Sequence, residues 1–339
     1  MTMKKLFLTT VFLSVFFTAT AQENIEDLLA AGIDDAKRYA HGYLSPAFDG
    51  ALYSITGGWF NSAETREPFR FSLSIIGSAS LIKEKNKYFT LNTSEYAYLQ
   101  FQDGSASKEV ATLFGDHPQP VVAYVEVDDG MGGTAQVDIT LPTGIAAGEI
   151  NMIPTAFLQA GMGLFMGTEV KLRFVPQLNY EGAKLNFYGV GVQHEFTKWL
   201  VPEDRRKLSV AGLIAYTHLD GSYDFTDTQV VAGSEQRFET DLNTWLFQLI
   251  ASTKISMIHL YGGMGYSEGT SQTALKGTYE ISEGVLAGES ITDPYALETR
   301  ITGLHGTVGA NVKLGVISIN ADYTIANFDH ISAGLNFIF

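Results

Sequence analysis

The last nine residues of the chain, 331–339, read ISAGLNFIF, an alternating pattern that ends on an aromatic residue. Because successive side chains of a β-strand point to opposite faces, five apolar side chains share one face of this segment. They are Ile331, Ala333, Leu335, Phe337 and Phe339. A soluble domain seldom finishes on such a strand, whereas an outer-membrane barrel does so routinely. The segment therefore predicts a strand with one face toward lipid.

The same period of two residues recurs from Arg70 onward. In residues 70–82 a row of serines lies opposite a mostly apolar row, which suits a strand between lipid and a wet lumen. Short turns alternate with longer polar segments, so the C-terminus is expected on the periplasmic side, beside the N-terminal segment. Five polar residues are predicted to face the lumen: His259, His305, Asn311, Asn320 and Asp322.

The strand pattern predicts an all-β fold, a transmembrane antiparallel up-and-down β-barrel over residues 70–339. About ten strands are clear, and residues 83–153 could raise the number to roughly 12–14. That stretch is either a long hairpin-rich loop or additional spanning strands. A two-sheet sandwich would also alternate, but its strands would usually be shorter and its apolar faces would meet across a core.

The N-terminus predicts export. Lys4 and Lys5 precede an apolar run, and Ala19-Thr20-Ala21 is a small-x-small cleavage site, so residues 1–21 are expected to be a cleaved signal peptide. No later apolar run is long enough for a membrane helix, although the mean hydropathy is +0.06. The chain contains no cysteine, which excludes disulfides and thiolate chemistry. Together these features predict the bacterial outer membrane.

Residues 22–69 are predicted to form an N-terminal helix and a plug-like segment. Asn24 to His41 carries apolar residues at three- and four-residue steps, which predicts an amphipathic helix. Residues 41–63 are rich in Gly, Ser, Pro and aromatic residues, which predicts a compact, irregular segment inside the lumen or below the barrel. Five aromatic residues are candidates for contacting a ligand: Tyr43, Phe48, Tyr53, Trp59 and Phe60.

Seven strand glycines are expected either to make room for an internal segment or to provide barrel curvature. They are Gly161, Gly163, Gly189, Gly191, Gly263, Gly303 and Gly309.

The formal net charge of −15 argues against nucleic acid as a partner, because nucleic acid selects basic surfaces. The acidic residues gather between strands, for example from Asp220 to Asp241 and from Glu280 to Glu298. Solvated loops explain this pattern. A sharper hypothesis is that divalent cations bridge these carboxylates to anionic lipid headgroups.

Enzyme signatures are absent from the sequence, and neither a catalytic site, a metal site nor a cofactor is expected. His218 and Asp220 are the nearest approach to an acid–base pair at a barrel mouth, but an ordinary His and Asp at a loop edge are the preferred explanation. His259 and His305 read as hydrogen-bonded lumen residues, since no second ligand lies two or four residues away.

Three segments carry a resemblance to known families. Residues 43–63 (YLSPAFDGALYSITGGWFNSA), residues 189–202 (GVGVQHEFTKWLVP) and the terminal strand resemble an uncharacterised family of outer-membrane barrels common in Bacteroidota. In the terminal strand, Gly334, Phe337 and Phe339 resemble the signal that hands barrels to their assembly machinery. More distantly, the helix-then-plug arrangement is similar to the FadL-type transporters, which implies an N-terminal hatch and hydrophobic cargo.

Three functions follow as hypotheses. The first is a plugged conduit for small hydrophobic molecules, with outer-membrane lipid and the assembly machinery as partners. The second is a structural or partner-binding barrel without transport activity, and the third is a surface hydrolase around His218 and Asp220. The sequence leaves the cargo, its direction and the oligomeric state open, because architecture limits function without naming it.

Overall fold

The computed structural model describes residues 32–117, 119, 121–128, 133–144, 150–180, 182–202, 207–224, 232–253, 257–280 and 288–339. The predicted signal peptide, residues 1–21, and the first part of the predicted helix, residues 24–31, lie outside the described residues. No helix in the described part of the chain is both long enough and apolar enough to cross a bilayer.

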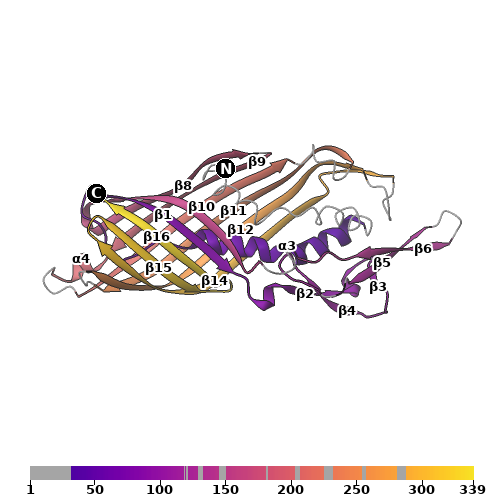
Figure 1. Ribbon diagram of the computed structural model, residues 1–339, viewed down its shortest axis with the longest axis horizontal. Helices are drawn as coiled ribbons and strands as arrows, with labels where there is room; N and C mark the ends of the chain where they lie inside the picture. Colours follow the sequence, from indigo (N-terminus) through magenta and orange to yellow (C-terminus); the bar gives the residue numbers. More distant parts are fainter. Residues whose placement is uncertain are drawn as a thin grey trace.

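Ten antiparallel strands close into a barrel, which confirms the predicted fold at the lower end of the expected strand number (Figure 1). The strands are β1 (Phe71–Leu81), β7 (Met152–Gly163), β8 (Thr168–Tyr180), β9 (Ala183–Glu195), β10 (Leu208–Asp224), β11 (Gly233–Thr253), β12 (Ile258–Glu280), β14 (Tyr295–Leu314), β15 (Ile317–Ile325) and β16 (His330–Ile338). Each strand pairs with the next along the chain, and β16 pairs with β1 to close the ring. A short strand, β13 (Ser290–Thr292), pairs only with the end of β12.

The two faces of the wall differ as the alternation predicts. On β14 and β15 the apolar residues Leu304, Val308 and Ile319 are exposed on the outside, and Asn311 and Asn320 are buried on the inside. Tyr188, Tyr216, Trp245 and Tyr266 lie on the outside of four neighbouring strands, and we call them the aromatic belt. A second group of exposed aromatic side chains marks the other end of the barrel: Phe165, Phe196 and Trp199. The outer surface between the two groups is the lipid-facing band.

A charge placed in this band is expected to be costly. Val308→Arg, on an exposed site between the two aromatic groups, should lower the free energy of unfolding in a bilayer by about 2–4 kcal/mol, the range for arginine near the midplane. Thr302→Arg, on the same face of β14 but two positions beyond Leu304, is the control and should cost about 0–1 kcal/mol. Urea titration in liposomes measures both, and equal costs would contradict the placement of the band.

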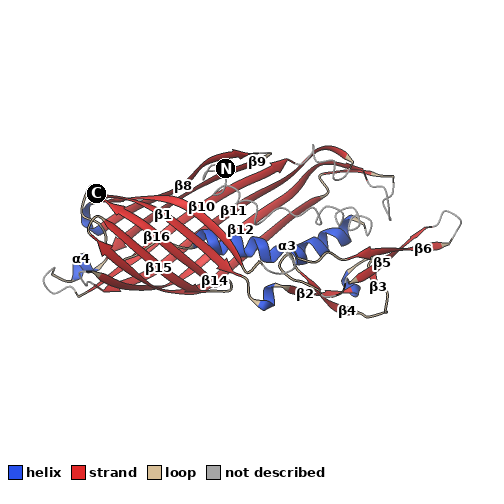
Figure 2. Ribbon diagram, viewed as in Figure 1, coloured by secondary structure: helices blue, strands red, loops and turns tan. Residues whose placement is uncertain are grey.

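The two ends of the barrel are different. The end that carries the C-terminus also carries two short connections, residues 164–167 and 315–316, and we call it the lower end. At the upper end, β15 and β16 stop after nine residues each, whereas β11 and β12 continue to 21 and 23 residues. The long strands therefore form a curved sheet that rises above the closed ring on one side (Figure 2).

Helix α3 (Ile33–Thr56) runs inside this structure and corrects the predicted boundary at His41. It contacts β1, β7, β11, β12 and β14, which lie on opposite sides of the ring, so the helix occupies the lumen. Pro46 lies within the helix and removes one backbone hydrogen bond. The helix nevertheless continues because it is packed on several sides, and the irregular part of the segment begins only at Gly57.

Residues 83–144 form a small cap at the upper end rather than spanning strands, which decides between the two interpretations of residues 83–153. The elements are η1 (Glu84–Asn86), β2 (Tyr88–Asn92), η2 (Thr93–Glu95), β3 (Gln100–Phe101), β4 (Ser107–Ala111), β5 (Val122–Asp128) and β6 (Thr134–Thr140). They pair as two small sheets, β2–β4 and β3–β5–β6, and neither joins the barrel. Burial raises the pKa of the Tyr96 hydroxyl in this cap to about 12.

The upper half of α3 is part of the cap core. The buried carboxylate of Asp35 accepts hydrogen bonds from the backbone N–H groups of Ala97, Tyr98 and Leu99, at 2.8, 2.8 and 3.1 Å. The Tyr39 ring packs edge-on against Phe89. The helix is therefore fixed at its beginning by the cap and continues from there into the barrel.

Candidate functional site: the plug and the wall around it

The segment that follows α3 fills the lower lumen. We call residues 57–67 the lower plug. Its aromatic residues Trp59 and Phe60 and its small residue Ala63 are buried in a cluster with wall residues of β10, β11 and β12. The chain then reaches β1 at the lower end, where the backbone of Phe71 exchanges hydrogen bonds with that of Phe339. The lower lumen is thus occupied by the chain's own residues.

Trp59 is the central contact between the lower plug and the wall. Its side chain is 1% exposed, and the Arg173 guanidinium carbon lies 3.7 Å from the centroid of its ring. A Cβ added at Gly191 would approach the same ring to 2.8 Å, and one at Gly189 to 3.1 Å. These two glycines make room for the indole, because any side chain there would overlap with it.

Of the seven glycines singled out in the sequence, five would meet the plug if they carried a Cβ. They are Gly161, Gly163, Gly189, Gly191 and Gly303. At the other two, Gly263 and Gly309, the added atom would instead meet wall residues. The prediction that small residues make room for an internal segment is therefore confirmed at most of these positions.

Gly191→Ala should weaken the plug contact. The added methyl group overlaps with a ring that Arg173 holds from another direction, so we expect a loss of about 1–3 kcal/mol in the free energy of unfolding, the range for an overpacked core. Gly77→Ala is the control, because nothing lies within 4 Å of its added Cβ. A urea titration followed by tryptophan fluorescence distinguishes the two. Equal stability of both variants would contradict the contact.

Charged wall residues hold the backbone of the lower plug. Two carboxylates accept from it: Glu195 from the N–H and hydroxyl of Thr65, at 2.9 and 3.1 Å, and Glu169 from the N–H of Arg66, at 3.2 Å. Glu169 also forms an ion pair with the Arg66 guanidinium. The Lys171 ammonium donates to the Trp59 carbonyl at 2.9 Å. Because both wall carboxylates are buried, these charge-assisted bonds are among the stronger ones that a protein makes.

Arg173 connects the plug with β7. Its Nε donates to Gln159 on β7 at 2.8 Å, and Nη1 donates to the Ile55 carbonyl in α3 at 3.3 Å. The guanidinium also lies over the ring of Phe157 on β7, with 4.2 Å between its carbon and the ring centroid. A single buried side chain on β8 therefore contacts the helix, the lower plug and the neighbouring strand.

Above Arg173 most side chains that pack around α3 are apolar, although the buried polar residues Ser78, Thr299 and His330 also lie at this height. The buried apolar side chains come from the helix itself, from β7, β9, β11 and β14, and from the connection between β15 and β16. They include Phe48, Leu52, Ile55, Phe157, Phe187, Leu242, Leu297, Ile301 and Phe328. The lumen thus has an apolar part around the helix and a lower part around residues 57–67, in which a second apolar cluster lies beside charged wall residues.

Backbone pairing between β7 and β8 covers only the lower halves of these strands. It ends at the pair Leu158–Phe174, and among the described residues no pair joins 152–157 to 175–180. Above this point β7 stays paired with β1, and β8 stays paired with β9. We call the two unpaired stretches the seam. Since Phe174 pairs with Tyr188, the seam begins near the aromatic belt.

Two prolines explain why pairing stops at the seam. Pro154 lies in the unpaired part of β7 and Pro176 in that of β8. Proline has no N–H to donate, so within sheets it is confined to edges, strand starts and bulges. The register of β8 against β9 is also irregular between Val175 and Leu178, on either side of Pro176. Both strands are therefore built as edges at this height.

The seam lies directly outside the apolar part of the lumen. Phe157 is the first unpaired residue of β7 and is buried on the inner face, where its ring stacks on Phe187 with 5.3 Å between centroids. Val175, the first unpaired residue of β8, packs against the same cluster. At the height of the seam, therefore, no continuous hydrogen-bond ladder lies between these apolar lumen residues and the outside of the barrel.

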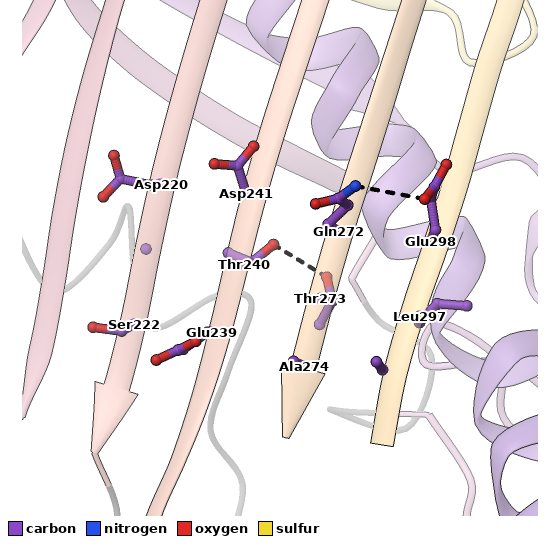
Figure 3. Close-up of a pocket in the computed structure, with 12 residues that line it drawn as sticks. Asp220, Ser222, Glu239, Thr240, Asp241, Gln272, Thr273, Ala274, Leu297 and Glu298 are labelled. Atoms are coloured by element: carbon purple, nitrogen blue, oxygen red, sulfur yellow. Dashed lines mark hydrogen bonds between the residues drawn. The ribbon is translucent and has the colours of Figure 1, made fainter. Parts of the chain in front are cut away.

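The long strands carry an acidic groove of about 650 Å³ on their outer face. Asp220, Asp241, Gln272 and Glu298 face one another in register across four strands, as Figure 3 shows. They lie beyond the aromatic belt along each strand, so this face is polar and stands above the lipid-facing band. Within the described residues, no group of three or more His, Asp or Glu side chains is arranged to hold a metal ion.

The five candidate plug aromatics are all buried and packed against protein. The Phe48 ring stacks on Phe238, the Tyr53 ring stacks on Phe328, and the Phe60 ring meets Tyr261 edge-on. Tyr43 belongs to the cap, where its hydroxyl donates to the Thr143 carbonyl at 2.8 Å. Four of the five therefore lie in the barrel, and Tyr43 lies above it.

The five lumen candidates His259, His305, Asn311, Asn320 and Asp322 are buried on the inner face. The two histidines occupy neighbouring strands but different heights, since His259 pairs with Asn311 and His305 pairs with Gly265. Asp322 accepts from the Tyr261 hydroxyl at 2.9 Å, and Asn320 donates to the same hydroxyl at 3.2 Å. These side chains therefore belong to a hydrogen-bonded lumen wall.

The remaining singled-out residues lie at the two ends of the wall. Phe337 and Phe339 end the last strand at the lower end, and Gly334 faces Asn320 across the β15–β16 pair. His218 is on the outer face of β10, where its Nε2 lies 3.2 Å from Asp220 and its Nδ1 lies 2.8 Å from the side-chain oxygen of Asn243. The pair is thus on the outside of the wall, not inside the barrel mouth.

The wall partners of the lower plug were not singled out in the sequence. Glu169, Lys171 and Arg173 occupy alternate positions of β8, within EVKLRFV, so all three share one face. The sequence does indicate that these three charges face the lumen, because charged side chains on a lipid-facing surface are costly. The opposite face of the same strand is apolar and carries Val170, Leu172 and Phe174.

The chain matches the family described as "Family of unknown function (DUF6588)" over residues 3–339 and belongs to that family. The comparison with curated proteins found no match. Among solved structures, Ail of Yersinia pestis is 12% identical with a TM-score of 0.28, over 80% of this chain and 100% of that chain. The translocator domain of autotransporter NalP from Neisseria meningitidis is 10% identical with a TM-score of 0.30, over 88% and 96%.

A Pseudomonas aeruginosa FadL homologue is 10% identical with a TM-score of 0.21, over 80% of this chain and 89% of that chain. Scores of this size carry no argument about function. The assignment of the barrel fold is based on the strand pairing described above.

Proposed function

We propose that this protein is an outer-membrane barrel that conducts small hydrophobic molecules and is closed by residues 33–67. The observation that carries the proposal is the seam between β7 and β8, which ends the wall's hydrogen-bond ladder beside the apolar part of the lumen. Lipid-soluble molecules partition into apolar surroundings, so a wall interrupted at this place favours them over ions or sugars.

The proposed route has two parts. A molecule enters or leaves between the unpaired stretches of β7 and β8, where Phe157 and Phe187 form the inner surface. The path toward the lower end is closed by Trp59 and by the charged wall residues around it. Passage therefore requires movement of the lower plug, whereas the upper half of α3 stays fixed in the cap.

Bridging the seam tests this proposal. The chain has no cysteine, so Ala156→Cys with Gln177→Cys places one thiol on each unpaired stretch and keeps both prolines, and oxidation or a bis-maleimide joins the two thiols. The matched control is Ala160→Cys with Leu172→Cys, which lies in the paired part of the same two strands. The probe is the fluorescent dye phenylnaphthylamine, whose entry into cells with and without the protein is recorded.

Joining the seam is expected to reduce dye entry to the rate of cells that lack the protein, while the control bridge leaves entry unchanged. Reduction of the disulfide should restore entry. Unchanged entry with a joined seam, or equal inhibition by both bridges, would remove the proposal.

Several further assignments belong to the same proposal. They are removal of the signal peptide after Ala21, insertion by the assembly machinery through Gly334, Phe337 and Phe339, and a bacteroidotal outer membrane as the location. We also propose that the protein has no enzymatic activity and does not bind nucleic acid, in keeping with its net charge of −15.

The cap favours a second candidate, a partner-binding barrel without transport. A folded unit whose buried residues, including Leu91, Phe101, Val125 and Ile139, continue the apolar cluster around α3 is more than a strand connection needs. Replacing residues 84–150 by a short linker tests this candidate. Loss of a copurifying envelope protein, with dye entry unchanged, would favour partner binding over conduction.

A further inference from the structure

The two ends of the internal segment lie at opposite ends of the barrel. Ile33 begins α3 within the cap, and the cap joins the upper ends of β1 and β7. Phe69 donates its backbone N–H to Gly163 at 2.8 Å, next to the turn between β7 and β8 at the lower end. Residues 33–69 therefore pass the whole height of the ring once, inside the ten strands (Figure 1).

The path is fixed at both ends. At the upper end, Asp35 accepts three backbone hydrogen bonds from the cap, and the Leu113 N–H donates to the Tyr43 carbonyl at 3.0 Å. At the lower end, Lys198 donates to the Thr65 carbonyl at 3.0 Å, from the connection between β9 and β10. The direction of the segment is therefore fixed by several hydrogen bonds at its two ends and does not depend on a single contact.

The barrel's own features orient it in a membrane. Bacterial barrels keep short turns on the periplasmic side and long connections outside the cell. Here the two longest connections, the 70 residues from 82 to 151 and the 14 residues from 281 to 294, are at the upper end, whereas the lower end has the short turns 164–167 and 315–316. The long strands also become acidic beyond the aromatic belt, so their upper parts stand in water. The lower end is thus the periplasmic one.

We propose that residues 33–69 cross the outer membrane inside the barrel as an eleventh span, with Gly32 on the cell-surface side and Phe69 on the periplasmic side. The chain enters the described fold from outside the cell and leaves it, at Phe339, inside the periplasm. The sequence predicts that the N-terminal segment lies beside the C-terminus. Only the lower plug does so, because the beginning of α3 lies at the other end of the barrel.

Single-cysteine labelling in intact cells tests this topology, because the natural chain offers no competing thiol. Lys37→Cys places an exposed thiol near the start of α3, and Glu67→Cys places one at the end of the lower plug. Gln102→Cys, exposed in the cap, marks the side on which the cap lies. A membrane-impermeant maleimide is applied before and after the outer membrane is permeabilised, and purified protein in detergent verifies that each thiol reacts.

Cysteines at positions 37 and 102 are expected to react in intact cells, and that at 67 only after permeabilisation. Reaction of position 67 in intact cells, or protection of position 37 until permeabilisation, would overturn the proposal. The outcome does not depend on whether the barrel conducts any molecule, so the topology and the proposed function stand or fall separately.

Discussion

Trp59→Ala is expected to lower the free energy of unfolding by about 3–5 kcal/mol, the range for deleting a large aromatic side chain from a core. The indole is buried between Arg173 and the two glycines of β9, so its removal leaves a cavity and takes away one of the two ring contacts of the guanidinium. The lower plug would lose its central contact, and dye entry should rise as a consequence. Urea titration in liposomes measures the first effect, and the dye assay the second.

Trp199→Ala is the matched control, because Trp199 is the same residue type but is 57% exposed at the lower end. Its replacement removes the hydrogen bond from its Nε1 to the Met166 carbonyl, at 3.1 Å, and should lower the free energy of unfolding by about 1 kcal/mol. Equal losses for the two variants would show that burial of Trp59 is not what holds the plug.

Glu169→Ala is expected to cost about 3–5 kcal/mol, because it leaves buried positive charge without its partner. Glu169 is 1% exposed, forms an ion pair with Arg66 and lies 3.8 Å from the Lys171 ammonium. Its loss also frees the Arg66 backbone N–H. The lower plug should therefore detach, with a fall in stability and greater access of proteases to residues 57–67.

Glu298→Ala is the control for this effect. Glu298 pairs with Arg300 at 2.8 Å on the outer face, where both side chains are well exposed, so the loss should be within about 0–1 kcal/mol. A double variant, Glu169→Ala with Arg66→Ala, should recover part of the stability by removing the uncompensated charge. No recovery would mean that the cost arises elsewhere than in the pair.

The barrel is largely predictable from the sequence, because facing follows from a period of two. Once Val308 and Ile319 are assigned to lipid, Asn311 and Asn320 must face inward, and the structure places them there. The even strand number and the short lower turns follow from the same pattern. Residues 83–144 could not be assigned, since short strands of a cap and short strands of a wall have the same local signal.

The path of the plug was less predictable. Pro46 and the surrounding glycines favour a break near His41, but packing inside the lumen outweighs local propensity and the helix continues to Thr56. The partners of Trp59 are distant in sequence and meet it only after the ring closes. The seam does have a local signal, Pro154 and Pro176 in strands that face each other, but it is readable only when the pairing of β7 with β8 is known.

A closed ring separates lipid from an internal segment, and the tryptophans test this arrangement most directly. Single-tryptophan variants that keep either Trp59 or Trp245, with phenylalanine at the other two positions, are reconstituted in bilayers with brominated acyl chains. Trp245 is 47% exposed on the outer face and should be quenched strongly, whereas Trp59 should keep its fluorescence and resist aqueous iodide as well. Strong quenching of Trp59 by the brominated lipid would contradict a plug enclosed by the barrel.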